Sequence, residues 1–215
     1  MRALGLMIFC IAPAILFGQT MAPAAAQHAV AAPAAVVASV DDDARTPLTP
    51  EQKIRRRALR LIEPVTLVST ALSAGIEQWR DVPHAWGQGA EGYAIRFASS
   101  EGFTAAHNGV ALSFDLAFHL DPRYRRKPGA RIGPRVWNAV SQTFIANRDS
   151  GGTMINVSEI GGNFGAGFLS NTWHPAGYNS PEDAVTRGML GLAFHTARNV
   201  VREFLPDVLH RGRHS

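Results

Sequence analysis

The sequence predicts an all-α domain, a bundle of about six helices whose packing faces are rich in Gly, Ala and Ser. Three observations predict it. Helix-start signals recur along the chain, apolar residues repeat at helical spacing between them, and no convincing run of alternating strand residues is present. We expect this helical domain to occupy residues 49–208.

The residues before the bundle are expected to be a secretory signal peptide and a disordered leader. Residues 1–26 have a short positive start, an apolar run and a small-x-small cleavage site that ends at Ala26. Residues 27–48 are rich in Ala and Pro and lack apolar periodicity. The only cysteine, Cys10, lies in the predicted signal peptide, so the exported chain would have no disulfide and no thiolate metal site. Residues 209–215 are expected to form a basic tail.

Capping and breaking residues place the six helices. Thr49 and Gln52 form a capping box for the first helix, and Asn156 and Glu159 form one for the fifth. Pro206 is expected to stop the last helix. The predicted helices cover residues 50–63, 64–79, 89–119, 133–147, 156–173 and 180–205.

Small residues are expected to let these helices approach closely. They recur at helical spacing in the third, fifth and last helices. The predicted packing glycines are Gly102, Gly109, Gly161, Gly165, Gly188 and Gly191. Residues 87–92 also match GxGxxG, but no strand precedes them, so we interpret them as a glycine-rich helix start rather than a dinucleotide site.

Charged residues on two helix faces are the candidates for chemistry. Glu101 and Asp115 lie on the polar face of the helix over 89–119, and the last helix carries cationic residues on one face. If these faces meet, Arg187, Arg198 and Arg202 would pair with the two acids in a buried ionic network. Such a network is more often a core contact that gives specificity than an active site. The candidate catalytic residues are Glu101, Asp115, His119 and His195.

Metal and cofactor sites are not predicted. The histidines do not have the spacing of a ligand set, and neither HExxH nor GxSxG occurs. The sequence therefore predicts no metal and no cofactor.

A basic segment predicts contact with an anionic surface. The chain has a net charge of +4, and cations cluster around the start of the fourth helix near aromatic residues. The predicted lipid-binding residues are Arg123, Arg125, Arg126, Lys127, Arg131 and Arg135. The longest uncharged apolar stretch of the exported chain, residues 64–76, is shorter than the ~20 residues that cross a bilayer.

Several distinctive motifs resemble those of a group of exported bacterial α-helical proteins with no known activity. The motifs are Trp86–Tyr93 (WGQGAEGY), Asp121–Tyr124 (DPRY), Thr172–Pro175 (TWHP) and Arg202–Asp207 (REFLPD). The resemblance covers roughly residues 77–208. It implies export and a shared fold, and it carries no catalytic role.

These observations lead to one functional hypothesis and two alternatives. The first is a non-enzymatic structural or lipid-binding bundle in the periplasm, peripheral to an envelope membrane, with the outer membrane favoured. Its partner would be anionic lipid or another envelope component. The sequence leaves open whether copies of the chain associate through the small-residue faces. Export excludes nucleic acid as a partner. The alternatives are an envelope hydrolase or transferase that uses the Glu/Asp/His/Arg residues, and a soluble periplasmic partner-binding module. A convergent polar cleft would favour the enzyme, and a sealed ionic network would favour the structural role.

Overall fold

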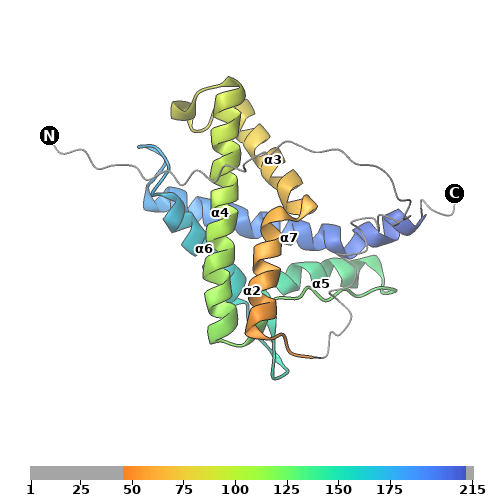
Figure 1. Ribbon diagram of the computed structural model, residues 1–215. Coiled ribbons are helices and arrows are strands. Elements are labelled where there is room, and N and C mark those ends of the chain that lie inside the picture. The colour runs from red at the N-terminus through yellow and green to blue at the C-terminus, as the bar shows by residue number, and fades with distance from the viewer. Residues whose placement is uncertain (1–45, 212–215) are drawn as a thin grey trace, which may run out of the picture. The chain divides into compact units, whose positions relative to one another are not determined.

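The computed structural model describes residues 46–211, and the all-α prediction is confirmed (Figure 1). The predicted signal peptide, nearly all of the predicted leader and residues 212–215 lie outside the described residues. Two short 3-10 helices, η1 (Arg60–Ile62) and η2 (His84–Trp86), connect the longer ones. The α-helices of the described part are α2 (Pro50–Leu59), α3 (Pro64–Trp79), α4 (Gly89–Ala117), α5 (Ile132–Phe144), α6 (Val157–Ser170) and α7 (Pro181–Arg211).

Two long helices organise the bundle. Helices α2 and α3 pack along α4, while α5 packs against α7. Helix α6 lies between α4 and α7 and contacts both, and α7 runs across the direction of α4 (Figure 1). Residues of α2, α4, α6 and α7 therefore meet in one region of the interior.

A small sheet corrects the prediction that strands are absent. Strands β1 (Leu120–Asp121), β2 (Ile145–Arg148) and β3 (Thr153–Ile155) pair antiparallel in that order. The predicted fourth helix was expected to continue to residue 147, but α5 ends at Phe144. Gly151 and Gly152 both have positive φ, which the tight turn between β2 and β3 requires.

The predicted stop at Pro206 is also wrong, because α7 continues to Arg211. A proline inside a helix removes one backbone donor and disturbs the preceding turn. Here side chains from outside the helix hold that turn. Arg126 and Arg135 both donate to the carbonyl oxygen of Glu203, and both form ion pairs with Asp207. The first residues of the predicted basic tail are therefore helical.

The capping predictions have different outcomes. Thr49 and Gln52 form the complete capping box at the start of α2. At α6, Asn156 Oδ1 accepts from the backbone N–H of Glu159 at 3.1 Å, but the Glu159 carboxylate does not return to the cap. It is directed into the interior, where it forms the ion pairs described below.

The loop before the GxGxxG segment, together with the first glycine of that segment, surrounds a buried arginine. Arg96 of α4 donates to the backbone carbonyl oxygens of Val82 (2.9 Å), Pro83 (2.9 Å) and Gly87 (2.7 Å). A Cβ at Gly92 would lie 2.9 Å from Arg96 Nη1 and against the carbonyl group of Gly87. Glycine at this position therefore allows the loop to close over the guanidinium group, and the pattern has a structural explanation.

Glycines of α6 allow close contact with α4. A Cβ at Gly161 would lie 2.5 Å from Phe114 Cε2, and one at Gly165 would lie 3.1 Å from Val110 Cγ1. Both distances are shorter than ordinary carbon contacts of ≈ 3.5–4.0 Å. A side chain at either position would push the two helices apart.

Glycines of α7 have the same role toward α6, whereas the predicted glycines of α4 do not. A Cβ at Gly188 would lie 2.7 Å from Phe164, and one at Gly191 would collide with the Asn163 side chain. A Cβ at Gly102 would make ordinary contact with Trp173 at 3.6 Å, and one at Gly109 would meet no described atom within 4 Å.

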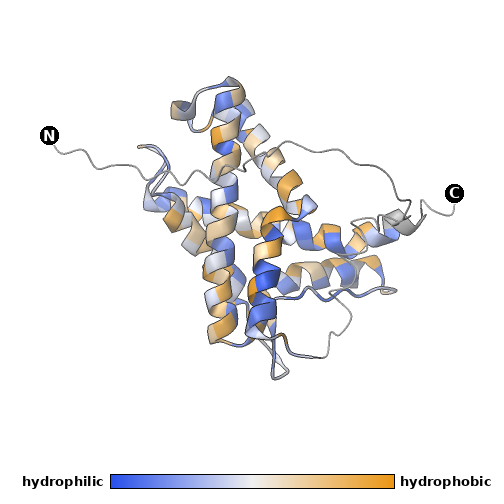
Figure 2. Cartoon of the chain, in the orientation of Figure 1, coloured by the Kyte–Doolittle hydropathy of each residue, from blue (hydrophilic) through white to orange (hydrophobic). Residues whose placement is uncertain are grey.

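The buried and exposed side chains are distributed in an unusual way. Most fully buried apolar residues are alanines, and the larger buried side chains are mainly charged or polar, including Arg57, Arg96 and Glu203. Large apolar side chains are exposed on the outer faces of α3, α5 and α7, and Figure 2 shows this hydrophobic colouring along α3 and α5. The interior of the described bundle is therefore held largely by polar contacts.

Candidate functional site

A buried carboxylate, Glu159 of α6, binds cations and histidines from four other elements. Its Oε1 accepts from Arg57 Nη1 at 2.9 Å and from Arg60 Nη1 at 3.3 Å. Its Oε2 lies 2.9 Å from His107 Nε2 and 3.0 Å from His195 Nδ1. Both oxygens of the carboxylate are thus occupied, and α2, η1, α4 and α7 converge on α6.

A second acid extends this group along α2 and α4. Arg57 Nε donates to Asp115 Oδ2 at 2.7 Å, and Ser158 donates to the other oxygen of Asp115. Lys53 forms an ion pair with Asp149 at 2.5 Å. We call the group the Glu159 cluster; it consists of Lys53, Arg57, Arg60, His107, Asp115, Asp149, Ser158, Glu159 and His195.

Burial decides the protonation of the histidines. It lowers the pKa of His195 to about 4 and also lowers the pKa of His107, although Glu159 opposes both shifts. Burial alone would raise the pKa of Glu159, but His195, Arg57 and His107 outweigh it and hold the pKa well below its usual range. At neutral pH the imidazoles are therefore uncharged hydrogen-bond partners, and the arginines balance the charge of Glu159.

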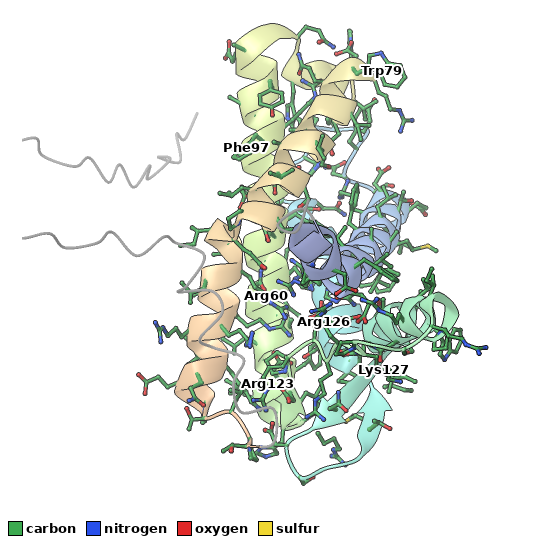
Figure 3. All side chains as sticks on the ribbon, turned by 90° about the vertical axis from the view of Figure 1, so that its right-hand side faces the viewer. Arg60, Trp79, Phe97, Arg123, Arg126 and Lys127 are labelled. Atoms are coloured by element: carbon green, nitrogen blue, oxygen red, sulfur yellow. The ribbon has the colours of Figure 1, made fainter. Side chains whose placement is uncertain are left out.

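A second cluster lies where the segment over 123–127 meets α7. Glu203 Oε2 accepts from the Tyr124 hydroxyl at 2.7 Å, and Oε1 accepts from the Lys127 backbone N–H and from Arg135 Nε, each at 3.1 Å. Figure 3 shows Arg126 and Lys127 beside α5 and α7. We call this the Glu203 cluster; it consists of Tyr124, Arg126, Lys127, Arg135, Asn138, Glu203 and Asp207.

Most residues predicted to bind lipid are engaged inside the chain. Arg123 and Arg125 form ion pairs with Asp121, and Arg126 and Arg135 belong to the Glu203 cluster. The side chains of Lys127 and Arg131 are exposed. The basic segment therefore presents less free charge to a surface than the sequence suggested.

The predicted catalytic residues are divided between different places. Asp115 and His195 lie in the Glu159 cluster, whereas Glu101 and His119 do not. Glu101 has a buried Oε1 with no hydrogen-bond partner among the described residues. His119 follows α4 in a left-handed conformation, and its carbonyl oxygen accepts from the Asp149 N–H. The structure therefore does not bring the four together.

The predicted ionic network also has different partners. The partner of Asp115 is Arg57 of α2, not an arginine of the last helix. Arg202 forms its ion pair with Glu63, and Arg198 Nη2 lies 3.1 Å from His195 Nδ1. Arg187 is elsewhere in the bundle, where it donates to Ser170 and to Asn171 and Tyr178.

Sequence reasoning missed Lys53, Arg57, Arg60 and the interior role of Glu159. A signal for the cations was present: they follow one another at the i, i+4, i+7 spacing of residues that face a core. For Glu159 the sequence predicts only a place in the capping box of the fifth helix.

A small polar cavity lies beside the Glu159 cluster. Its volume is about 30 Å³, and its wall includes Arg57, Arg60, Arg123, Tyr124 and Arg202. No group of three or more His, Cys, Asp or Glu residues in the described part of the chain is arranged to hold a metal ion.

No protein-family model matches the chain, and neither the curated proteins nor the solved structures contain a significant match to it.

Proposed function

We propose that this chain is a non-enzymatic structural bundle of the bacterial envelope, which lies at a membrane surface and contacts lipid through apolar helix faces. The observation that carries the proposal is the arrangement of a polar, small-residue interior beneath exposed apolar faces. A protein in water usually buries its large apolar residues, and contiguous exposed patches mark contact with a partner or a membrane.

Helix α3 shows this face most clearly. Val68, Leu72 and Ile76 follow one another at i, i+4, i+8 and are each about half or more exposed, at 60%, 61% and 49%. Trp79 ends the helix at 85% exposure, and the exposed Arg80 follows it. An apolar stripe that ends in tryptophan and arginine is typical of a helix at a membrane interface.

Other helices present similar faces. Trp137 of α5 and Met189 of α7 are 72% and 61% exposed. Further exposed apolar residues on these two helices are Ile132, Val136, Phe144, Val185, Leu190, Phe194, Val201 and Leu205. Burial of such faces in lipid would contribute roughly 25 cal/mol per Å² of apolar surface.

The length of the described helices bears on the depth of insertion. No single helix in the described residues is both long and apolar enough to cross a bilayer. Residues Pro50–Ile62 and Pro64–Trp79 meet the length and composition requirement only as a pair, which is bent by 46°.

The Glu159 cluster supports the structural part of the proposal. Its carboxylate has four partners and its histidines are uncharged at neutral pH, so the cluster joins helices rather than presenting a free reactive group. Full pairing of the central carboxylate supports a structural role over an enzymatic one.

Fractionation of expressing cells is the direct test. We expect the chain in the membrane pellet, with release by alkaline carbonate because it lies on the surface. Release by high salt alone would indicate binding through charge rather than through the apolar faces. Recovery in the soluble periplasmic fraction without any wash would overturn the proposal in favour of a partner-binding module.

Vesicle flotation tests the α3 face itself. The double variant Leu72→Glu/Ile76→Glu should lose at least about tenfold in vesicle affinity, because two charges would enter the apolar layer. The control Ser150→Glu/Thr172→Glu adds the same charge at exposed positions away from α3 and should bind as before. Equal binding by both variants would exclude α3 as the lipid-contacting face.

A further inference from the structure

We propose that the cavity beside the Glu159 cluster binds a small oxyanion of the phosphate class. This inference goes beyond the membrane role proposed above and does not depend on it. It rests on which charges line the cavity, on how they are already paired, and on the space that remains.

The wall of the cavity carries more positive than negative charge. Four guanidinium groups line it, and the acids of the wall are Asp115, Asp121 and Glu159. Asp121 is shared further, because Arg125 also forms an ion pair with it. His195, which lies in the wall, is uncharged at neutral pH. The guanidinium groups are those of Arg57, Arg60, Arg123 and Arg202.

Arg60 is a buried cation that shares its carboxylate partner with another arginine. Its side chain is 8% exposed, and its Nη1 lies 3.3 Å from Glu159 Oε1, the same oxygen that Arg57 approaches at 2.9 Å. Its Nη2 donates to the Pro122 carbonyl oxygen at 2.8 Å. Burial and the neighbouring Arg57 lower the pKa of Arg60 well below its usual value. A buried cation in this position is stabilised by any anion that reaches it.

Arg202 supplies free donors at the same wall. Its Nη2 contacts both oxygens of Glu63, while Nε and Nη1 have no hydrogen-bond partner among the described residues. The side chain is 25% exposed, so this side of the cavity is open to solvent. A guanidinium group presents its donors as a planar fork that matches the oxygens of phosphate, which a lysine does not.

The size of the cavity fits a small ligand. A volume of about 30 Å³ is room for roughly two waters or one compact anion. In Figure 3, Arg60 lies near the junction of α2 and α3, on the side that faces α7. An anion there would contact groups from α2, η1, the segment after β1 and α7, so binding would tie these elements together.

Thermal denaturation of the full chain in nonionic detergent tests the proposal, with inorganic phosphate as the probe and ionic strength held constant with chloride. We expect the midpoint to rise with the logarithm of the phosphate concentration above the dissociation constant, by about 5–10 °C at ~100 times that constant. An unchanged midpoint, or the same rise in Arg202→Gln, would overturn the proposal.

Variants assign the binding to this cavity. Arg60→Gln and Arg202→Gln should each raise the dissociation constant for phosphate at least about tenfold, measured by calorimetry. Arg202 is partly exposed, so its variant decides the matter if Arg60→Gln does not fold. Arg187→Gln removes a guanidinium outside the cavity wall and should leave the constant unchanged. Unchanged binding by both cavity variants would also overturn the proposal.

Vesicles distinguish a free oxyanion from a lipid headgroup. If phosphate displaces the chain from phosphatidylglycerol vesicles at constant ionic strength, the cavity takes the headgroup phosphate. If phosphate binds without displacing the chain, the cavity takes the free ion. A chain that binds phosphate but no vesicles would refute the membrane role alone, and a chain that binds vesicles but not phosphate would refute the oxyanion site alone.

Discussion

The Glu159 cluster and the Glu203 cluster use similar chemistry to join different parts of the molecule. Each places one carboxylate among arginines that are distant in the sequence. Glu159 joins helix to helix at the crossing of α4, α6 and α7. Glu203 instead fastens the segment over 123–127 to α7, through a tyrosine hydroxyl and a backbone N–H.

The two clusters also differ in their access to water. Both carboxylates are buried, but Asp207, the second acid of the Glu203 cluster, is 44% exposed. Arg126 and Arg135 of that cluster therefore keep the solvated carboxylate of Asp207 as a partner when Glu203 is replaced. Arg60 in the Glu159 cluster has no other carboxylate partner among the described residues. The comparison therefore predicts that the same substitution has unequal consequences in the two places.

Neutralising Glu159 should have the largest effect. Glu159→Gln leaves Arg57 short of one partner and Arg60 without a carboxylate in a buried site, so we expect a loss of ~3–5 kcal/mol in the free energy of unfolding. Denaturant unfolding followed by circular dichroism measures it. The matched control is Glu101→Gln on α4, which breaks no ion pair among the described residues and should change stability by less than ~1 kcal/mol.

Neutralising Glu203 should cost less and act locally. Glu203→Gln weakens charge-assisted hydrogen bonds worth ~1.5–3 kcal/mol, while Arg126 and Arg135 keep Asp207. Hydrogen exchange should accelerate at the Lys127 amide more than in α4. A loss as large as that of Glu159→Gln, spread over the whole bundle, would contradict the distinction between the clusters.

Adding a methyl group at Gly162 should disturb the Glu159 cluster through packing alone. A Cβ there would lie 2.8 Å from His107 Cδ2 and 3.0 Å from the Ala111 Cβ. We expect Gly162→Ala to cost ~1–3 kcal/mol, measured by denaturant unfolding. The control is Gly109→Ala in α4, where the added Cβ would meet no described atom within 4 Å. It should be neutral or stabilising by up to ~1 kcal/mol. A neutral Gly162→Ala would mean that His107 is not fixed in place.

Mild acid should weaken the Glu159 cluster before the Glu203 cluster. The pKa of His195 is lowered from 6.5 to about 4, so between these values the unfolded chain binds a proton that the folded chain does not. Stability therefore falls as the pH falls through this interval. The pKa values of Glu203 and Asp207 are lowered from 4.5 and 3.8, so their contribution is lost only at lower pH.

The measurement is unfolding as a function of pH, with His195→Gln as the comparison. Burial raises the pKa of Glu77 to about 7, and this carboxyl contributes the opposite sign, since its stabilisation is lost as the pH rises from 4.5 through 7. Glu77→Gln should therefore be present both in the reference chain and in the His195→Gln variant. The free energy of unfolding should depend less steeply on pH in the chain with His195→Gln. An equal dependence on pH in both chains would mean that His195 does not titrate as described.

The helices could be predicted because local signals determine them. Thr49, Pro50 and Gln52 begin α2 by their own hydrogen bonds and backbone preference, which need no tertiary partner. The end of α7 was not predicted, because the turn before Pro206 is contacted by Arg126 and Arg135, which are distant in the sequence. The hairpin of β2 and β3 was missed for a related reason, since its strands are too short to give a periodic signal.

The candidate site was predictable in kind but not in its partners. Helical spacing correctly gave Asp115 an ionic role and indicated that acids and arginines would meet. It did not show which helix faces α4, because that depends on the packing of α2 and α6. The partners of Asp115 and His195 are therefore properties of the fold rather than of either helix.

The loop around Arg96 has a meaning that its hydrogen bonds alone do not express. Three backbone carbonyl oxygens point at one positive charge, as they would in a binding loop for a metal cation. The ion in this case is covalently attached to α4, so it cannot dissociate or be removed by a chelator. The loop therefore contains its cation in every folded copy of the chain, because loop and cation belong to the same chain.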